Sequence, residues 1–194
     1  MTFDFKPYAF TIAEGQSPPW NMDERHIQML YKSLRSYAGP FRAVEIGSYR
    51  GASTAAFVEA INAGSDMTLL CVEPSPTPEL YAVLAHCKRP ERIKVFSGCS
   101  HECNWQDHCD FLFVDGCHDW PAIYEVGMGL AKNVPVIAMH DTAGLFECWG
   151  SALAFRMLEQ SDRSYVLDNE KREGENTDRG FCVAVRPGYE GMLP

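Results

Sequence analysis

The stretch that most constrains the fold of this chain spans residues 41–54 and reads FRAVEIGSYRGAST. Residues 43–46 form a short apolar run of the kind found in strands that are buried on both faces. Residues 47–51 follow as a glycine turn, and residues 52–63 have the composition of a helix that stops at Gly64. A strand, a glycine turn and a helix begin a βαβ unit, in which backbone N–H groups and a helix N-terminus can face a ligand.

The glycine turn has the spacing G-x-x-x-G, formed by Gly47 and Gly51. Gly47 allows the backbone to turn sharply, and Gly51 allows a ligand or a strand to approach closely. A dinucleotide-binding loop has G-x-G-x-x-G and a phosphate-binding loop has G-x-x-x-x-G-K-[ST], and this turn has neither pattern. An ordinary strand-to-helix turn fits it as well as a cofactor-binding loop does, so the downstream sequence has to decide.

The length of 194 residues predicts one domain over residues 1–194, with an N-terminal arm and helix in residues 1–40 and the core in residues 41–194. A formal net charge of -9 argues against nucleic acid or an anionic membrane as a partner, because these bind basic patches. The sequence has neither a membrane-spanning apolar run nor a signal-peptide pattern. With eight cysteines and no export signal, we expect a reduced, cytoplasmic protein.

Apolar runs alternate with helical patterns along the core. Strands are predicted over residues 43–46, 67–73, 92–98, 110–115 and 134–139, and helices over 52–63, 77–87, 121–131 and 145–159. An earlier helix is expected from the spacing of Ile27, Leu30, Tyr31, Leu34 and Tyr37. Two further strands, 164–167 and 181–186, have no helix between them. The order predicts an α/β fold, a Rossmann-like, doubly wound, mostly parallel seven-stranded sheet with an antiparallel C-terminal hairpin.

Acidic residues, histidines and small polar residues follow the predicted strands at their carboxyl ends. These residues are Glu45, Gly47, Glu73, Gly98, Cys99, Ser100, Asp115, His118, His140 and Asp141. Ligands of open α/β sheets bind outside this edge. Glu73 follows the glycine turn by roughly 20 residues, the place where a carboxylate accepts both hydroxyls of a ribose. An adenosine-containing ligand fits this pattern, although an exposed carboxylate without a ligand is the simpler alternative.

Two later motifs make the function more specific. FLFVDGCHDW, followed by a predicted helix and VIAMHD, resembles the Asp-Gly-x-His-x-aromatic and His-Asp motifs of macrocin-type and cephalosporin-biosynthesis-type small-molecule O-methyltransferases. EIGSYRGAST resembles motif I of the class I S-adenosylmethionine-dependent methyltransferases, and VFSGCS and RGFCVAV stand in matching places. The resemblance implies a core that binds S-adenosylmethionine and an activity that moves its methyl group to a hydroxyl of a small molecule.

The resemblance also implies roles for individual residues. Glu45, Gly47, Ser48 and Gly51 would surround the methionine part of the cofactor, Glu73 would hold the ribose, Cys99 and Ser100 would lie by the adenine, and Asp115 would complete the cofactor site. Two positions depart from the family pattern. Cys99 stands where the family often has Asp, and Val126 stands where it usually has a helical Asp.

The acceptor hydroxyl can be activated in two ways. His118 or His140, with Asp141 beside it, can act as a general base in catalysis. Alternatively, Asp115, His140 and Asp141 can bind Mg²⁺, which lowers the pKa of a bound hydroxyl, although imidazole is a poor ligand for this oxygen-preferring cation. The sequence predicts both sets as candidates and does not separate them.

Several alternatives stay open. A nicotinamide-dependent oxidoreductase would share the fold but needs the missing glycines, and a methyltransferase-like binding protein would keep the cofactor pocket without chemistry. The thiols and imidazoles between Cys99 and His118 could instead hold zinc, although their spacing is irregular. The aromatic residues Trp20, Trp120, Phe146 and Trp149 are candidates for the wall of a substrate pocket. The aromatic N-terminal arm suggests a homodimer.

Overall fold

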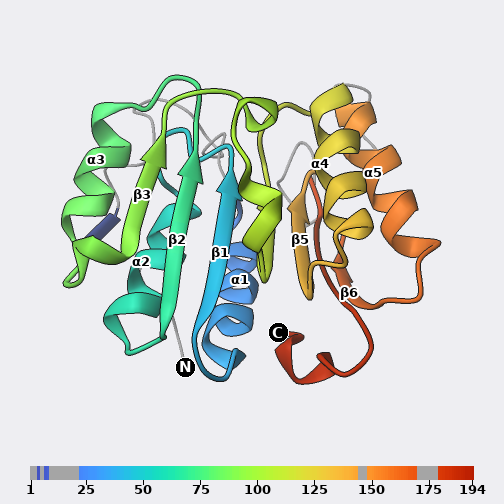
Figure 1. Cartoon of the computed structure of the whole chain (residues 1–194), viewed down its shortest axis with the longest axis horizontal. Coiled ribbons are helices and arrows are strands. Elements are labelled where there is room, and N and C mark those ends of the chain that lie inside the picture. The colour runs from blue at the N-terminus through green and yellow to red at the C-terminus, as the bar shows by residue number, and fades with distance from the viewer. Residues whose placement is uncertain (1–3, 5–6, 9–21, 144–147, 170–178) are drawn as a thin grey trace.

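The computed structural model describes residues 4, 7, 8, 22–143, 148–169 and 179–194, which form a seven-stranded sheet with helices on both faces (Figure 1). The strands are β1 (Phe41–Ile46), β2 (Met67–Val72), β3 (Ile93–Phe96), β4 (Phe111–Val114), β5 (Val136–His140), β6 (Ser164–Asp168) and β7 (Phe181–Val185). The α-helices are α1 (Glu24–Ser36), α2 (Thr54–Asn62), α3 (Pro78–Ala85), α4 (Trp120–Ala131) and α5 (Trp149–Glu159). None of these described helices has both the length and the apolar character that crossing a bilayer requires.

The strands lie in the order β3-β2-β1-β4-β5-β7-β6. The pairs from β3 to β5 are parallel, whereas β7 is antiparallel to both of its neighbours, β5 and β6. The predicted Rossmann-like sheet with an antiparallel C-terminal hairpin is therefore confirmed. The chain leaves β1 toward β2 and later returns to β4 on the other side of β1, which creates the crevice at which such sheets bind ligands.

Successive side chains of the strands alternate between two hydrophobic clusters. On β4, Phe111 and Phe113 belong to the cluster that includes α1 and α2, whereas Leu112 and Val114 belong to the one that includes α4 and α5. Figure 1 shows the corresponding layers, with the sheet between them. Because both faces of the sheet are covered, a ligand site is expected at the carboxyl edge of the strands.

The sequence predicts Thr77 as the N-cap and Pro78 as the first position of the helix over residues 77–87. The start of α3 is as predicted, and the start of α1 is not. The hydroxyl of Thr77 accepts the backbone N–H of Leu80 at 3.3 Å, and Pro78 takes the first helical position. For the first helix, a capping box from Asn21 to Glu24 is expected from the sequence. In the structure α1 begins at Glu24 itself, after Asp23, which makes no side-chain cap. Asn21 lies outside the described residues.

The sequence places Leu145, Trp149, Leu153 and Met157 on one apolar stripe, and this prediction selects the wrong face of α5. Trp149 and Leu153 are 41% and 51% exposed, and the buried apolar residues of the helix are Ala154, Phe155 and Leu158. Two apolar stripes run along this helix, and its packing against α4 and β5 decides which one is covered. Leu145 lies outside the described residues, as does the predicted arm apart from residues 4, 7 and 8.

Candidate active site

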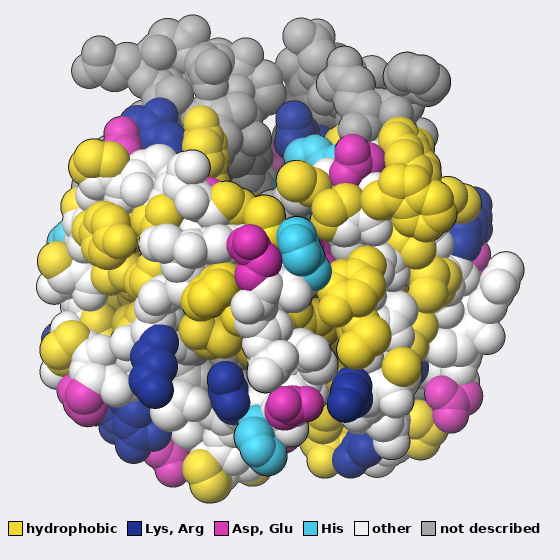
Figure 2. Space-filling view, turned by 45° about the horizontal axis from the view of Figure 1, so that its top comes forward, with side chains coloured by type: hydrophobic (Ala, Val, Ile, Leu, Met, Phe, Trp, Pro, Cys, Tyr) yellow, Lys and Arg dark blue, Asp and Glu magenta, His cyan; other side chains and the backbone are white. Residues whose placement is uncertain are grey.

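A cavity of about 500 Å³ lies at the carboxyl ends of the central strands. Its walls include, among others, Gly47, Ser48, Glu73, Cys99, Ser100, Asp115, His118 and His140. The volume is in the range of cofactor and small-molecule sites. Figure 2 brings this edge forward and shows acidic and histidine side chains side by side near its centre, with hydrophobic side chains around them.

The carboxylate of Glu45 holds the glycine turn in place through hydrogen bonds. Its carboxylate is fully buried and accepts hydrogen bonds from the hydroxyls of Ser48 at 2.8 Å, Ser53 at 2.6 Å and Thr54 at 2.7 Å. Burial raises the pKa of Glu45, and the three hydrogen bonds oppose that shift. All three donors belong to the turn or the start of α2, so Glu45 positions the loop and does not itself line the cavity.

The two glycines of the turn are required by close packing. Gly47 has a φ of 90°, and a Cβ there would lie 2.3 Å from the carbonyl oxygen of Asp115. Gly51 has a φ of 89°, and a Cβ there would lie 2.9 Å from the side chain of Val83 on α3. Gly47 therefore lets the ends of β1 and β4 meet at the cavity, whereas Gly51 supports the turn from outside it.

Glu73 directly follows β2 and presents an oriented carboxylate to the cavity. One of its oxygens accepts the backbone N–H of Tyr49 and the other accepts that of Ser75, each at 2.9 Å. The residue is only 8% exposed. A carboxylate has about four acceptor positions, so each oxygen keeps a lone pair for a ligand hydroxyl.

A second carboxyl group, Glu125 of α4, also lines the cavity. The hydroxyl of Ser100 donates to its Oε1 at 2.6 Å. Burial raises the pKa of Glu125 to about 7, against the lowering effect of that hydrogen bond. Sequence reasoning misses Glu125 and points to its neighbour Val126, which is buried in the core. The available signal was a charged residue among the apolar residues of the predicted helix 121–131.

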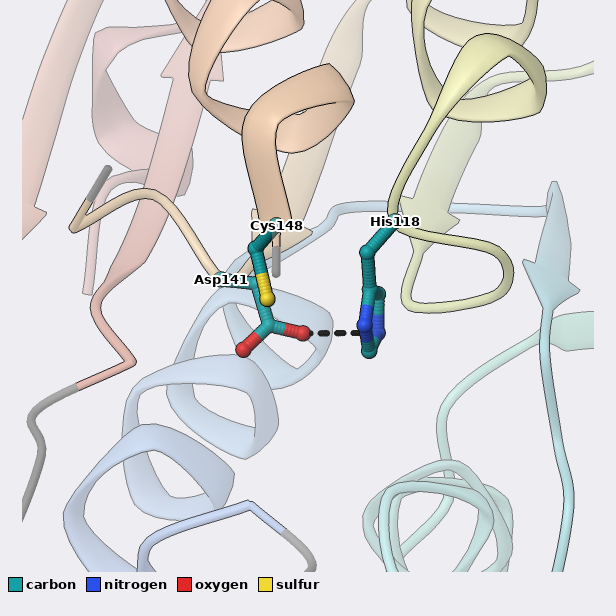
Figure 3. Close-up of side chains that lie close together, drawn as sticks. All are labelled: His118, Asp141 and Cys148. Atoms are coloured by element: carbon teal, nitrogen blue, oxygen red, sulfur yellow. Dashed lines mark ion pairs between the residues drawn. The ribbon is translucent and has the colours of Figure 1, made fainter. Parts of the chain in front are cut away.

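His118, Asp141 and Cys148 meet beside the cavity (Figure 3). His118 follows β4, Asp141 follows β5 and Cys148 precedes α5, and His118 Nε2 lies 2.8 Å from Asp141 Oδ2. The backbone N–H of Gly150 donates to the carbonyl of His118 at 2.9 Å, which holds the start of α5 against this loop. A Cβ at Gly150 would lie 2.0 Å from the carbonyl oxygen of Asp119, so this contact requires glycine.

The His118–Asp141 pair is charged at neutral pH. Contact with the Asp141 carboxylate, aided by Cys148 and opposed by burial, raises the pKa of His118 to about 10. Burial alone would raise the pKa of Asp141, but the imidazoles of His118 and His140 hold it well below its usual range. Asp141 also has a φ of 60°, a left-handed conformation that is uncommon outside glycine and is frequent at functional sites.

His140 lies deeper and is surrounded by polar partners. Its Nδ1 is 3.3 Å from Asp115 Oδ1, and its Nε2 is 3.3 Å from Nδ1 of His26 on α1. Burial lowers the pKa of His140, but the carboxylates of Asp115 and Asp141 outweigh it and raise the pKa to about 10. His26 is a further residue that sequence reasoning misses, because it lies in an otherwise ordinary amphipathic helix.

Most of the predicted site residues come together around the cavity. Three of them do not line the cavity, and these are Glu45, Gly51 and Asp141. Arg179, which precedes β7, lines the cavity with its Nη1 3.6 Å from Asp141 Oδ1, and nothing in the sequence marks it.

A zinc site within residues 99–118 alone does not form. Among the described residues, two groups of three candidate ligands converge, and they are His118 with Asp141 and Cys148, and Asp115 with His140 and Asp141. Neither group includes Cys99, Cys103 or Cys109.

Comparisons with known proteins agree with this geometry. The sequence model of the family described as "Methyltransferase domain" matches residues 44–142, which is half of the chain and extends from within β1 through β5, with most of the cavity residues. No curated protein sequence matches the chain significantly.

Several solved structures have a similar fold. The O-methyltransferase TomG from Streptomyces achromogenes, involved in tomaymycin synthesis and solved in complex with SAM, is 17% identical, with a TM-score of 0.71 over 97% of this chain and 92% of that chain. The O-methyltransferase from Bacillus cereus in complex with SAH is 15% identical, with a TM-score of 0.68 over 87% and 84% of the two chains. The C-terminal domain of precorrin-6Y C5,15-methyltransferase from Rhodobacter capsulatus is 12% identical, with a TM-score of 0.62 over 92% and 95%.

Proposed function

The chain belongs to the methyltransferase domain family, and on that premise we propose that it transfers a methyl group from S-adenosylmethionine to a hydroxyl group of a small molecule. The observation that carries the proposal is the Glu73 carboxylate, which two backbone N–H groups orient at the wall of a cavity of about 500 Å³. TomG and the Bacillus cereus O-methyltransferase, which share the fold, were solved with SAM and SAH respectively.

The residues of the cavity fit this cofactor. The free lone pairs of Glu73 suit the two hydroxyls of a ribose. Gly47 and Ser48, which follow β1, line the cavity where the methionine part would bind, and Cys99 and Ser100, which follow β3, line it where the adenine would bind. Asp115, which follows β4, also lines the cavity. When bound, S-adenosylmethionine supplies an electrophilic methyl group attached to a positively charged sulfur.

His118 is the residue best placed to receive the proton of an acceptor hydroxyl. It lines the cavity, its side chain is 30% exposed, and Asp141 holds its ring from behind. A general base must be neutral, whereas the contact with Asp141 raises the pKa of His118 to about 10. A positive charge in the same cavity lowers the pKa of an imidazole, so the sulfonium of a bound cofactor would shift His118 toward the neutral form that a base requires. His140 is enclosed by Asp115 and His26, and we assign it to positioning.

The predicted Mg²⁺ site fits the residues poorly. Ligand atoms of Asp115, His140 and Asp141 lie within 4.8 Å of one another, which is close enough for a cation. Mg²⁺ prefers six oxygen ligands, whereas this set offers two carboxylates with an imidazole between them. Nδ1 of that imidazole lies 3.3 Å from Asp115 and 3.6 Å from Asp141, so the imidazole pairs with both carboxylates. We therefore derive no step that uses Mg²⁺.

The acceptor is proposed to carry an apolar or aromatic part. Trp120 and Trp149 are 70% and 41% exposed, and their rings meet edge to face with centroids 6.0 Å apart. Neither tryptophan lines the cavity, but Trp120 is two residues from His118, and we propose that the pair borders an acceptor beside the proposed base. Trp20 and Phe146, the other aromatic candidates, lie outside the described residues. The homodimer and the cytoplasmic location stay predictions.

Calorimetric titration with S-adenosylmethionine, its demethylated product and NAD tests the proposal, followed by methyl-transfer assays on a panel of hydroxylated acceptors. We expect binding of the first two and turnover with at least one phenol or alcohol. Binding of NAD alone would favour the oxidoreductase. Cofactor binding without turnover on any acceptor would favour a binding protein.

A further inference from the structure

Three side chains with different donor atoms converge from separate segments of the chain. The Nε2 or Nδ1 of His118, a carboxylate oxygen of Asp141 and the Sγ of Cys148 all lie within 4.8 Å of one another. Figure 3 shows the three side chains pointing toward a common space. The hydrogen bond from Gly150 N–H to the carbonyl of His118 holds two of the three segments together, so the convergence is built into the fold.

The Asp141 carboxylate is deeply buried and is contacted by cationic groups. The residue is 1% exposed. Among the described residues its side chain forms ion pairs with His118 at 2.8 Å from Oδ2, and with Arg179 and His140 each at 3.6 Å from Oδ1. A buried carboxylate in this setting is held as an anion, which makes it a candidate ligand for a metal cation.

From this geometry we infer that His118, Asp141 and Cys148 bind Zn²⁺. One imidazole, one carboxylate and one thiolate form a three-ligand set of the kind that leaves the fourth tetrahedral position open. Ligand atoms around Zn²⁺ are roughly 3.4 Å apart when the bonds have their usual lengths of about 2.0–2.3 Å, so His118 and Asp141 must separate by about 0.6 Å. Sulfur and imidazole donors select Zn²⁺ over Mg²⁺.

The open position would face the cavity, because His118 lines the wall while Asp141 and Cys148 lie behind it. An oxygen ligand of Zn²⁺ has a lowered pKa. With Zn²⁺ bound, His118 would have released its proton and would serve as a ligand, so the metal would replace the imidazole in activating an acceptor hydroxyl in the proposed reaction. The binding itself does not depend on that reaction, so the two proposals can fail separately.

The test is a metal titration of the full chain after treatment with a chelator. Co²⁺ is added first as a spectroscopic probe and is then displaced by Zn²⁺. The wild-type protein is compared with Cys148→Ser and with the matched control Cys117→Ser, which removes an exposed thiol next to His118. We expect one equivalent of Co²⁺ with a thiolate-to-cobalt absorption band in the wild-type protein and in Cys117→Ser. We expect Cys148→Ser to lose the band and to bind Zn²⁺ at least about 10-fold more weakly.

The proposal is overturned if the wild-type protein binds no stoichiometric metal, or if the band survives in Cys148→Ser. If Cys148→Ser does not fold, X-ray absorption at the zinc edge of the wild-type protein decides instead. One sulfur with nitrogen and oxygen neighbours supports the site, whereas no sulfur or more than one sulfur contradicts it.

Discussion

The two sides of the cavity are stabilised in different ways. On the side of β1 and β2, the carboxylates of Glu45 and Glu73 accept hydrogen bonds from neutral hydroxyl and backbone donors at 2.6–2.9 Å. On the side of β4 and β5, charged groups contact one another directly, as His118 and His140 do with Asp141. Asp141 itself has a left-handed backbone.

This difference suggests that one side of the cavity binds the cofactor and the other transfers protons. Hydrogen bonds from fixed neutral donors keep a binding surface in one shape, which suits a constant cofactor. Adjacent opposite charges have pKa values that respond to each arriving charge, which suits proton transfer. We therefore expect substitutions on the β1–β2 side to change stability and cofactor affinity, and substitutions on the β4–β5 side to change turnover.

The largest effect is expected for His118→Gln. Gln keeps a polar side chain at the cavity wall but cannot act as a base near neutral pH, so turnover should fall by about 10²–10⁴-fold. Because His118 lies on the β4–β5 side, the dissociation constant for S-adenosylmethionine should change little. Steady-state kinetics together with calorimetry measure both quantities. A large loss of cofactor affinity with normal turnover at saturation would reverse the proposed division.

Glu45→Ala should have the next largest effect, and on stability. It removes the acceptor of three buried hydroxyls, those of Ser48, Ser53 and Thr54, which should lower the free energy of unfolding by roughly 3 kcal/mol. Glu79→Ala is the matched control, because it removes a partly exposed carboxylate paired with Arg50 and should cost much less. Denaturant unfolding monitored by circular dichroism measures both variants. Equal losses would mean that the buried network contributes no special stability.

The same contrast explains how much of the site could be predicted from the sequence. The β1–β2 side depends on contacts between residues close in the chain, such as Glu45 with Ser48, so a short motif carries most of the information. The cap at Thr77 could be predicted for the same reason. The roles of individual cofactor residues stay predictions, although most of those residues line the cavity.

The β4–β5 side depends on contacts between distant residues. Cys148 reaches His118 only because α5 docks on the loop after β4, and His26 reaches His140 from the other end of the chain. Neither pairing leaves a local signal in the sequence. The face of α5 is a related case, since two apolar stripes compete and tertiary packing selects the one with Phe155.

A smaller effect is expected for Glu73→Ala. Losing a carboxylate that accepts ribose hydroxyls should remove about 1.5–3 kcal/mol of binding, which is roughly a 10–100-fold increase in the dissociation constant for S-adenosylmethionine. Glu73→Gln keeps one acceptor oxygen and should lose less. Calorimetric titration of both variants gives the comparison, with turnover at saturating cofactor as the second readout. Unchanged affinity in the Ala variant would place the ribose elsewhere.

The smallest effect is expected for Glu125→Gln, and its sign depends on pH. Burial raises the pKa of Glu125 to about 7, so folding favours the protonated form. The stability that this group contributes is present below the unfolded pKa, near 4.5, and is lost as the pH rises through about 7.

Gln imitates the protonated acid and can still accept the Ser100 hydroxyl. The variant should match the wild-type protein at about pH 4 and exceed its free energy of unfolding at pH 8, by at most about 3 kcal/mol. Unfolding curves at several pH values measure the difference, and a variant that is less stable at pH 8 would show that Glu125 is held as a carboxylate. In that case the end of the cavity near Ser100 would resemble the Glu73 side, with a fixed anion rather than a group that titrates near neutrality.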